Sequence, residues 1–557
     1  MAGLASAAVD ETVLISRASG AGGAGGDGAS LQPATSANGR YVAFVSSATN
    51  LSPEGSGRRI YLRDTVANTT TLVSRQTGTG PGGAPNSDSF APAISADGRY
   101  VAFESKADNL SDDDVGGTWD IYVRDTVSNT TTLASRQTGT ASGNGGDASS
   151  FASSISADGR YVAFDSKAEN LSSDDTATTD DVYVRDTVAN TTTLISRQSG
   201  TSAGNGGDGG STEASISADG RYVAFESDAP NLSADDFPYQ GIFVRDTVAN
   251  TTSLVSRASG AAGMNGANDI SKTPSISADG RFIAFESAGN NLADNDLNGF
   301  PDIFVRDTQA NTTIRASVQN GTASTNGADA DSHEPSISGD GRFVAFSSYA
   351  SNLSSDDKTG SNIFVRDTQA NTTTLISRQT GTAPLNGADD SSTAPSISAD
   401  GTTVAFESKA DNLSSEDNDA VESNVFARQF RALPVGGGGG PGPAQPLKCD
   451  GVKVTKQGTN RADTLKGTRK RDVITGLGGN DVISGLKGND LICGGKGKDK
   501  ELGGRGKDKL LGQLGADTLL GGPGSDRLLG GPGRDNLIGG GAIDKLLGGA
   551  GKDNQTQ

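Results

Sequence analysis

The chain of 557 residues has little of several residue types on which enzymes and membrane proteins depend. Its one histidine, His333, leaves a histidine-dependent triad, a multi-histidine zinc site and a two-histidine iron site without the residues they need. Nucleophile-elbow and phosphate-loop motifs are absent. No apolar run approaches the roughly 20 residues of a membrane-spanning helix, so no membrane span is expected. We therefore predict a protein without enzymatic activity.

Cysteine and large apolar residues are also scarce. Only 33% of residues are hydrophobic, which is little for helix packing but sufficient for repeat folds whose short strands share a core. The two cysteines, Cys449 and Cys493, do not form a CxxC motif, so no metal or redox site is indicated. In an oxidising compartment a disulfide between them would contribute about 4 kcal/mol, and two free thiols are the alternative.

Charge is distributed unevenly along the chain. The net charge is −20, but residues from 448 onward carry 19 Lys and Arg against 13 Asp and Glu, which leaves 28 against 54 for the rest. The N-terminal part is therefore acidic and the C-terminal part basic. An acidic surface repels phosphates, so we expect no nucleic-acid partner and instead a cation or a basic surface.

An aspartate recurs at every ninth position near the C-terminus. Glycines before it allow tight turns that point carbonyl oxygens at one spot, and the carboxylate adds a charged oxygen, a donor set that suits calcium. An aliphatic residue two places later predicts one inward side chain per short strand of a parallel β-roll. The aspartates are Asp463, Asp472, Asp481, Asp490, Asp499, Asp508, Asp517, Asp526, Asp535, Asp544 and Asp553.

Units such as GLKGNDLIC and GGRGKDKLL resemble the RTX family of hemolysin-type calcium-binding nonapeptides, GGxGxDxUx, over residues 458–552. The resemblance implies Ca²⁺ as the bound ion, an extracellular location, and folding coupled to calcium. The predicted ligand residues are Asp481, Asp490, Asp499, Asp508, Asp517, Asp526 and Asp535, with Gly478, Gly479, Gly488, Gly494, Gly495, Gly497, Gly503, Gly504, Gly506, Gly521, Gly522, Gly524, Gly530, Gly531 and Gly533.

Some units depart from this pattern. The units ending at Asp463 and Asp472 lack the glycine pair, Glu501 replaces an inward aliphatic residue, and Ala542-Ile543 precedes Asp544. We expect these units to be weaker sites or caps, with Asp472 and Asp544 as secondary ligand candidates. A flexible glycine-rich tail is the alternative to the roll, but the strict register disfavours it.

Seven further units of 59 to 61 residues precede this region, each marked by a turn glycine in S-x-[DN]-G. The second unit contains four alternating β-branched and aromatic segments, at residues 92–95, 100–105, 120–125 and 130–136. Seven units of four strands predict a seven-bladed β-propeller. The turn glycines are Gly39, Gly98, Gly159, Gly220, Gly280, Gly341 and Gly401.

The ends of this repeat region predict how the ring closes. The seventh unit stops after residues 424–428 without its last strand, whereas residues 12–17 near the start are a spare copy of that strand. We expect the N-terminal strand to complete the last blade, which removes two exposed edges. The motif PSISADGRYVAFES…DIYVRD resembles TolB-type, WD40-like propeller repeats, which imply a fold but no activity.

The fold class predicted is therefore all-β, a propeller followed by a parallel roll. Residues 11–431 form the propeller, 432–447 a Gly/Pro linker, and 448–557 the roll.

Acidic loops are expected to crowd one face of the propeller. In the fifth unit, Asp294, Asp296, Asn298 and Asp302 with Gly299 resemble the start of an EF-hand loop, and calcium there and a solvated loop with Asx-turns are both open readings. Arg99 and Asp125 are expected to pair for structural support. His333, in the place of Phe90 in another unit, is expected to be a rim residue rather than a base.

These features predict a secreted calcium-binding protein whose propeller is a recognition scaffold. Its acidic face would bind an extracellular protein or polysaccharide, and its roll would fold on calcium. The alternative is a glycoside hydrolase that uses propeller carboxylates, although carboxylates repeated almost identically around a ring lack the unlike environments that a catalytic pair needs. Attachment to an anionic wall polymer through the basic roll is a third hypothesis.

Overall fold

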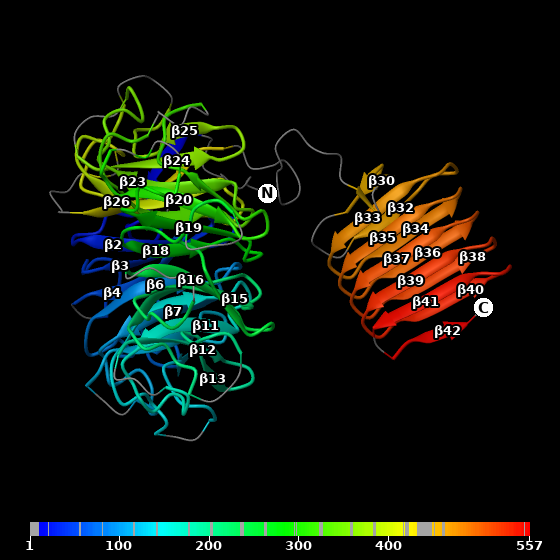
Figure 1. Cartoon of the computed structure of the whole chain (residues 1–557), viewed down its shortest axis with the longest axis horizontal. Helices are drawn as coiled ribbons and strands as arrows, with labels where there is room; N and C mark the ends of the chain where they lie inside the picture. Colours follow the sequence, from blue (N-terminus) through cyan, green and yellow to red (C-terminus); the bar gives the residue numbers. More distant parts are fainter. Residues whose placement is uncertain are drawn as a thin grey trace. The chain divides into compact units, whose positions relative to one another are not determined.

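A computed structural model gives the fold. It describes residues 10–431 and 448–556 apart from short segments at 21, 55–56, 81, 115–116, 141–142, 176–178, 201–203, 234–238, 261–264, 294–295, 297, 322–326, 357–359, 382–385, 416, 418–422, 450–451, 459–462 and 551. The predicted linker, 432–447, lies outside the described residues. The chain divides into two compact units, Met1–Ala432 and Leu433–Gln557, and every described element of both is a β-strand (Figure 1).

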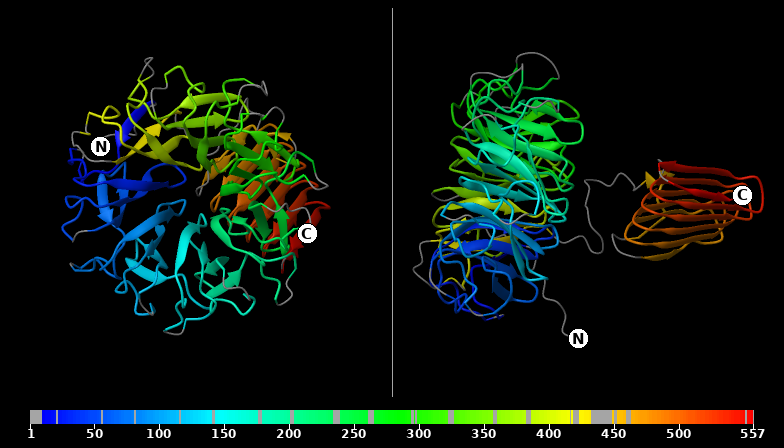
Figure 2. Two further views of the ribbon diagram at one scale, coloured as in Figure 1. Left: turned by 60° about the vertical axis from the view of Figure 1, so that its left-hand side comes forward. Right: turned by 90° about the horizontal axis from the view of Figure 1, so that it is seen from below.

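The first unit is a seven-bladed β-propeller, as predicted. Seven four-stranded antiparallel sheets surround a central axis (Figure 2), and the first strands of successive blades contact one another around the ring. The first three blades consist of β2 (Ser30–Thr35), β3 (Tyr41–Ser46), β4 (Arg59–Asp64) and β5 (Thr69–Leu72); β6 (Ser89–Ile94), β7 (Tyr100–Ser105), β8 (Asp120–Asp125) and β9 (Thr130–Leu133); and β10 (Ser150–Ile155), β11 (Tyr161–Ser166), β12 (Asp181–Asp186) and β13 (Thr191–Leu194).

The next three blades repeat this order. They consist of β14 (Ser211–Ile216), β15 (Tyr222–Ser227), β16 (Gly241–Asp246) and β17 (Thr251–Leu254); β18 (Ser271–Ile276), β19 (Phe282–Ser287), β20 (Asp302–Asp307) and β21 (Thr312–Arg315); and β22 (Ser332–Ile337), β23 (Phe343–Ser348), β24 (Asn362–Asp367) and β25 (Thr372–Leu375).

The seventh blade is closed by the N-terminus. Its strands β26 (Ser392–Ile397), β27 (Thr403–Ser408) and β28 (Asn424–Gln429) are followed by β1 (Glu11–Leu14), which pairs antiparallel with β28. Arg428 is buried at this seam, where it donates hydrogen bonds to Thr12 Oγ1 at 2.9 Å and Gln379 O at 2.9 Å. The predicted closure by the N-terminal strand is confirmed.

Alternating side chains explain the blade cores. The second and third strands are almost fully buried because both faces pack against neighbouring blades, and their aromatic residues stack in pairs such as Phe103 with Tyr122. The inner strand differs from the prediction because it begins three residues earlier, at Ser89, and has a bulge between Phe90 and Ala93. Ala91 takes a positive φ of 46° at this bulge.

Arginine–aspartate pairs lie at the β-turns of the blades, as predicted. Arg99 Nη2 is 2.7 Å from Asp125 Oδ2, and its guanidinium carbon lies 4.8 Å from the ring centre of Tyr100. The pair recurs in five further blades, as Arg40–Asp64, Arg160–Asp186, Arg221–Asp246, Arg281–Asp307 and Arg342–Asp367.

The second unit is a parallel β-roll, also as predicted. Two six-stranded parallel sheets face each other, and successive strands of one sheet are one coil of 18 residues apart. One sheet contains β31 (Lys456–Gln457), β33 (Val473–Gly478), β35 (Leu491–Lys496), β37 (Lys509–Leu514), β39 (Arg527–Pro532) and β41 (Lys545–Ala550). The other contains β32 (Thr464–Lys466), β34 (Val482–Lys487), β36 (Lys500–Arg505), β38 (Thr518–Gly522), β40 (Asn536–Gly540) and β42 (Asn554–Thr556).

The core of the roll takes one aliphatic side chain from each of eight strands. This core consists of Leu465, Ile474, Ile483, Ile492, Leu510, Leu519, Leu528 and Leu537. A two-stranded ribbon, β29 (Lys448–Cys449) and β30 (Val452–Lys453), precedes the coils and is joined to β35 by the disulfide Cys449–Cys493. The predicted disulfide is confirmed.

Candidate metal centre

The aspartates of the nonapeptides form two rows along the turns of the roll. Within each row, one carboxylate oxygen holds the neighbouring coil: Asp490 N–H donates to Asp508 Oδ1 at 2.8 Å, and Asp508 N–H donates to Asp526 Oδ1 at 2.8 Å. Asp481, Asp499 and Asp517 make the same bonds in the other row. The nine-residue period thus places alternate aspartates directly above one another, one coil apart.

The second oxygen of these carboxylates points to the inside of the turn. Seven aspartates are almost fully buried, and their Oδ2 atoms accept no hydrogen bond among the described residues: Asp481, Asp490, Asp499, Asp508, Asp517, Asp526 and Asp535. Burial raises the pKa of Asp490, Asp508, Asp517 and Asp526 to about 6. A buried carboxylate oxygen without a donor is costly unless a cation neutralises it.

Glycine is required where the chain approaches each carboxylate. A Cβ added to Gly503 would lie 2.6 Å from Asp508 Oδ2 and 2.7 Å from Gly521 O of the next coil, so a side chain would fill the space between these two oxygens. We call this space, between an aspartate Oδ2 and the carbonyl oxygen of the next coil beside a glycine, a cradle. The same cradle recurs at Gly521 with Asp526. Only glycine leaves room there for an ion between a carboxylate and a carbonyl.

The predicted glycines fall into two groups. Gly494, Gly503, Gly521 and Gly530 line the cradles, whereas the other predicted glycines that have a left-handed φ shape the turns: Gly479, Gly488, Gly495, Gly497, Gly504, Gly506, Gly522, Gly524, Gly531 and Gly533. Gly478 ends β33. The prediction missed five glycines with the same arrangement, which the first position of each nine-residue unit would have marked: Gly458, Gly467, Gly476, Gly485 and Gly512.

The flanking units differ from the central ones. Asp472 Oδ2 accepts hydrogen bonds from Thr468 N–H at 2.6 Å and Thr468 Oγ1–H at 2.9 Å, so a threonine occupies the oxygen that the central units leave open. At the other end, Asp544 Oδ1 accepts a bond from Asp526 N–H at 2.8 Å, while Ile543 beside it is largely exposed. The arrangement at Asp472 is that of a cap.

Glu501 is a buried charge that the sequence marked only as a departure. Its side chain is fully buried in the aliphatic row of the roll, and neither carboxylate oxygen makes a hydrogen bond of normal geometry within the described residues. Burial, followed by the charges of Asp517 and Asp499, raises its pKa well above the usual range, and the nearby Gly494 N–H opposes that rise.

The donor set of the roll fits calcium. Within the described part of the chain, no three His, Cys, Asp or Glu side chains lie close enough to hold a metal by themselves. The cradles instead combine an aspartate carboxylate with a peptide carbonyl of the next coil, hard oxygen donors of the kind that calcium prefers. The open oxygens of the seven aspartates and the glycine cradles are the observations that support this fit.

Most acidic loop residues of the propeller have partners within their blade. Tyr122 Oη–H donates to Asp114 Oδ2 at 2.7 Å, and Arg197 Nη1 lies 2.7 Å from Asp174 Oδ2. The two loops expected on one face do meet, since Asp147 N–H donates to Asn170 Oδ1 at 3.2 Å. These repeated contacts indicate structural support of the loops.

In the fifth unit, the side chain of Arg315 on β21 forms ion pairs with the acidic loop. Arg315 Nη1 lies 3.1 Å from Asp296 Oδ1 and 3.2 Å from Asp302 Oδ2, and Asn298 Nδ2–H donates to Asp302 Oδ2 at 3.2 Å. Other blades have leucine at the position of Arg315. Asp294 lies outside the described residues. The chain thus supplies these carboxylates with a positive charge, and calcium in this loop stays a prediction.

Carboxylates near the central axis hold neighbouring blades together. Glu104 Oε2 accepts the bulge N–H of Ala152 in the next blade at 3.3 Å, and Glu226 Oε2 that of Thr273 at 3.1 Å. In the first blade the position of Glu104 is occupied by Val45, which has no acceptor. Gln32 Oε1 of the inner strand β2 accepts the bulge N–H of Ala91 in the next blade instead, at 3.1 Å.

The sixth blade has Ser347 at that position, and Glu334 Oε2 accepts the N–H of Ala394 at 2.8 Å. The acceptor is therefore restored from the inner strand wherever the second strand lacks it. This substitution indicates that the ring of acceptors is structural.

His333 lies on the inner strand β22. Its Nδ1 is 3.0 Å from Glu286 Oε1, and this contact raises the histidine pKa. Lys272 Nζ lies 3.2 Å from the same oxygen. His333 and Lys272 are thus two partners of the same Glu286 oxygen.

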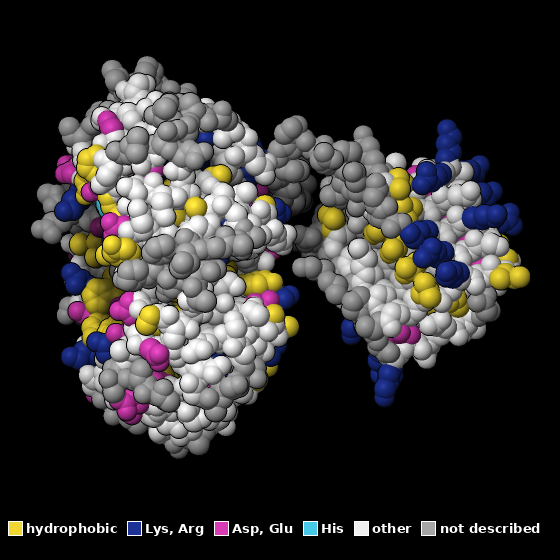
Figure 3. Space-filling model, viewed as in Figure 1, with side chains coloured by type: hydrophobic (Ala, Val, Ile, Leu, Met, Phe, Trp, Pro, Cys, Tyr) yellow, Lys and Arg dark blue, Asp and Glu magenta, His cyan; other side chains and the backbone are white. Residues whose placement is uncertain are grey.

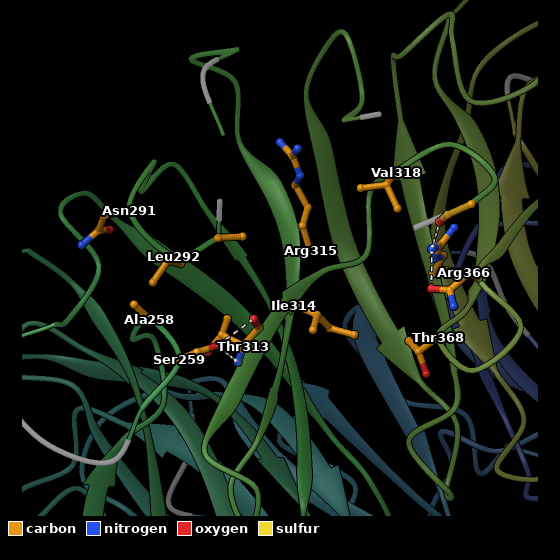
Figure 4. A pocket seen from close by; sticks show the side chains of 13 residues that line it. Ala258, Ser259, Asn291, Leu292, Thr313, Ile314, Arg315, Val318, Arg366 and Thr368 are labelled. Atoms are coloured by element: carbon orange, nitrogen blue, oxygen red, sulfur yellow. Dashed lines mark hydrogen bonds between the residues drawn. The ribbon is translucent and has the colours of Figure 1, made fainter. Parts of the chain in front are cut away.

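One cavity of the propeller is bounded in part by residues that depart from the repeat. It has a volume of about 550 Å³, and Figure 4 shows Ile314 and Arg315 of β21 around it together with Leu292 and Val318. The position of Ile314 is Thr or Ser in five other blades and Val13 in the seventh, and that of Arg315 is Leu in every other blade. Ile314 is 44% exposed. The fifth unit therefore gives this cavity side chains that the repeat does not provide.

The geometry of the roll agrees with a match to a known family of repeats. The family model described as "RTX calcium-binding nonapeptide repeat (4 copies)" matches residues 457–492, 467–500, 494–528, 502–537 and 529–554. The C-terminal region therefore carries RTX calcium-binding repeats. No curated protein matches the chain.

Solved structures similar to this chain include propellers with low sequence identity. TolB from Acinetobacter baumannii is 16% identical, with a TM-score of 0.30, over 51% of this chain and 53% of its own length. A putative TolB from Agrobacterium tumefaciens is 16% identical, with a TM-score of 0.32, over 65% and 95%. The β-propeller domain of the Trilobed protease from Pyrococcus furiosus is 12% identical, with a TM-score of 0.42, over 73% and 97%.

The chain thus spans about half the length of the first of these relatives. The described residues form no helix of the length and apolarity that crossing a membrane requires.

Proposed function

We propose that this chain is a secreted, non-enzymatic calcium-binding protein in which the propeller recognises a partner and the roll folds when calcium is bound. The observation that carries the calcium function is the row of seven buried aspartate oxygens without hydrogen-bond donors among the described residues. Without a cation these groups oppose folding, and with calcium they become ligands.

Two observations support a location outside the cell. The Cys449–Cys493 disulfide suits an oxidising compartment, since cytosolic thiols are kept reduced. Sites built from one carboxylate and carbonyls carry little ligand charge, which favours binding where calcium is plentiful.

The recognition role rests on the cavity beside Arg315. It combines exposed Ile314, buried Leu292 and a buried guanidinium on the fifth blade alone, as a selective surface requires. An extracellular protein or polysaccharide is the partner class that we propose. A screen of glycans and proteins against the wild type and Ile314→Asp tests it, because the variant should lose binding while keeping the wild-type melting temperature.

Calcium titration of the full chain tests the calcium function. We expect a gain of β signal in far-ultraviolet circular dichroism between micromolar and millimolar calcium, and calorimetric binding of several ions. Asp508→Asn should lower the number of ions bound, whereas Asp208→Asn on an exposed propeller loop should not. A wild-type chain that shows neither binding heat nor a spectral change would exclude the proposal.

A glycoside hydrolase is the second candidate function, and one pair of residues favours it. Burial and the charge of neighbouring Glu213 raise the pKa of Asp165 to about 8, an environment that its counterparts in the other blades do not share in full. A proton held at neutral pH is what a general acid needs. Release of reducing sugar by the wild type and its loss in Asp165→Asn would support hydrolysis.

A further inference from the structure

Glu501 lies where the repeat demands an aliphatic residue. Its neighbours in the inward row of its sheet are Ile483 on one side and Leu519 on the other. A lone carboxylate in such a row would lose its hydration without compensation, and its replacement by an aliphatic side chain would be expected to stabilise the roll. Glu501 is not isolated in this row, because other oxygen atoms lie close to its carboxylate.

The Glu501 carboxylate reaches the calcium cradle of its own unit. A Cβ built on Gly494 would lie 2.6 Å from Asp499 Oδ2, 2.6 Å from Glu501 Oε1 and 2.9 Å from Gly512 O. The cradles at Gly503, Gly512 and Gly521 present only the aspartate and the carbonyl of the next coil as near oxygens. The cradle of Asp499 is thus enriched by a second carboxylate.

We propose that Glu501 is a calcium ligand that shares one ion with Asp499, and that this is the tightest calcium site of the roll. The inference rests on the proposed calcium function and goes beyond the nonapeptide pattern, in which the inward residue contributes only to the core. Glu501 is fully buried, neither of its carboxylate oxygens has a hydrogen-bond partner among the described residues, and its Oε1 lies beside the space that Asp499 Oδ2 and Gly512 O border. A second negative ligand raises calcium affinity.

A role as calcium ligand would explain why Glu501 replaces the aliphatic residue of the repeat. The third carboxylate nearby, that of Asp517, belongs to the next coil of the same row. A tight site in the middle of the row would order coils on both sides of it, because each coil is held to the next by the aspartate hydrogen bonds. Calcium binding would then begin near Asp499 and extend outward.

Calorimetric calcium titration of the full chain at neutral pH, with wild type, Glu501→Leu and Glu501→Gln, tests the proposal. We expect both variants to lose the tightest binding phase, with an affinity on the order of tenfold or more lower for that ion. Glu501→Leu completes the aliphatic row, so a folding defect should not accompany the loss. Circular dichroism at saturating calcium verifies that the variant folds.

Double substitutions show whether the two carboxylates bind the same ion. Asp499→Asn combined with Glu501→Leu should weaken the tight phase less than the sum of the two single effects, whereas Asp535→Asn, two coils away, should add to Glu501→Leu. Wild-type chain that binds calcium and Glu501→Leu that binds as many ions with equal or higher affinity would overturn the inference alone. A wild-type chain that binds no calcium would instead overturn the calcium function.

Discussion

At the scale of single residues, Asp165 couples the stability of the propeller to pH. Burial raises its folded-state pKa to about 8 from an ordinary 3.8, so the folded propeller holds this proton more tightly than the unfolded chain does. The stabilising contribution is therefore present below about pH 4 and is lost as the pH rises through about 8. Its size is of the order of a few kcal/mol at most.

Asp165→Asn should remove this dependence. The amide keeps an oxygen for Glu213 N–H, which donates to Asp165 Oδ1 at 3.3 Å. We expect the variant to melt at a higher temperature than the wild type at pH 9 and at the same temperature near pH 4, as monitored by Trp119 fluorescence. Asp246→Asn is the control of opposite sign, since Arg221 lowers the Asp246 pKa to about 2. A pH-independent difference for Asp165→Asn would contradict the argument.

Sequence reasoning identified the buried aspartates of the roll as predicted ligands, but not the residues that modify their surroundings. The aspartates recur at a fixed spacing of nine residues, which can be read directly from the sequence. The surroundings of Glu501 and Arg315 depend on how the chain folds: Glu501 Oε1 lies beside Gly494 of the preceding strand, and Arg315 meets Asp296 from 19 residues away. A substitution within a repeat reveals only that a position differs, not what the new side chain contacts.

At the scale of elements, β1 determines whether the propeller is closed. Deletion of residues 1–17 would leave the edge of β28 unpaired and take from Arg428 its partners Thr12 and Asp10, at 2.9 and 3.2 Å. We expect a lower melting temperature and aggregation through the exposed edge. A peptide of residues 10–18 added to the truncated protein should restore both properties. Deletion of residues 1–9 is the matched control, and equal melting of both truncations would exclude this role.

The strand order of both units was predictable, whereas the limits of the inner strands were not. Alternation and turn glycines mark the second and third strands, and β7 and β8 match their predicted bounds. The inner strand β6 begins earlier because Ala91 adopts a positive φ at a bulge, a conformation that no glycine announces in the sequence. The N–H at the bulge is instead satisfied by a carboxylate of the adjacent blade, as Glu104 does for Ala152, and these two residues are 48 positions apart in the chain.

At the scale of the whole molecule, the two units differ in what stabilises them. The propeller has an aromatic and aliphatic core, whereas the core of the roll is one narrow row of aliphatic residues beside buried carboxylates. Among the charged side chains that the roll displays in Figure 3, Lys and Arg predominate. Bound calcium would neutralise the aspartates inside while these cations remain outside, which supports the hypothesis of attachment to an anionic polymer.

Calcium removal should therefore unfold one unit and spare the other. The roll contains no Trp, Tyr or Phe, and the only tryptophan, Trp119, packs in the propeller with ring-centre distances of 5.7 Å to Phe90 and 6.5 Å to Phe151. Chelation of calcium should reduce the β signal in circular dichroism and leave the fluorescence melting curve of Trp119 unchanged, because only the roll needs the ion to compensate its buried charge. Magnesium at the same concentration, which dehydrates reluctantly and demands octahedral geometry, should not restore the lost signal. A calcium-dependent shift of the fluorescence transition would contradict this division and would instead place calcium in the propeller, as the acidic loop of the fifth unit predicts.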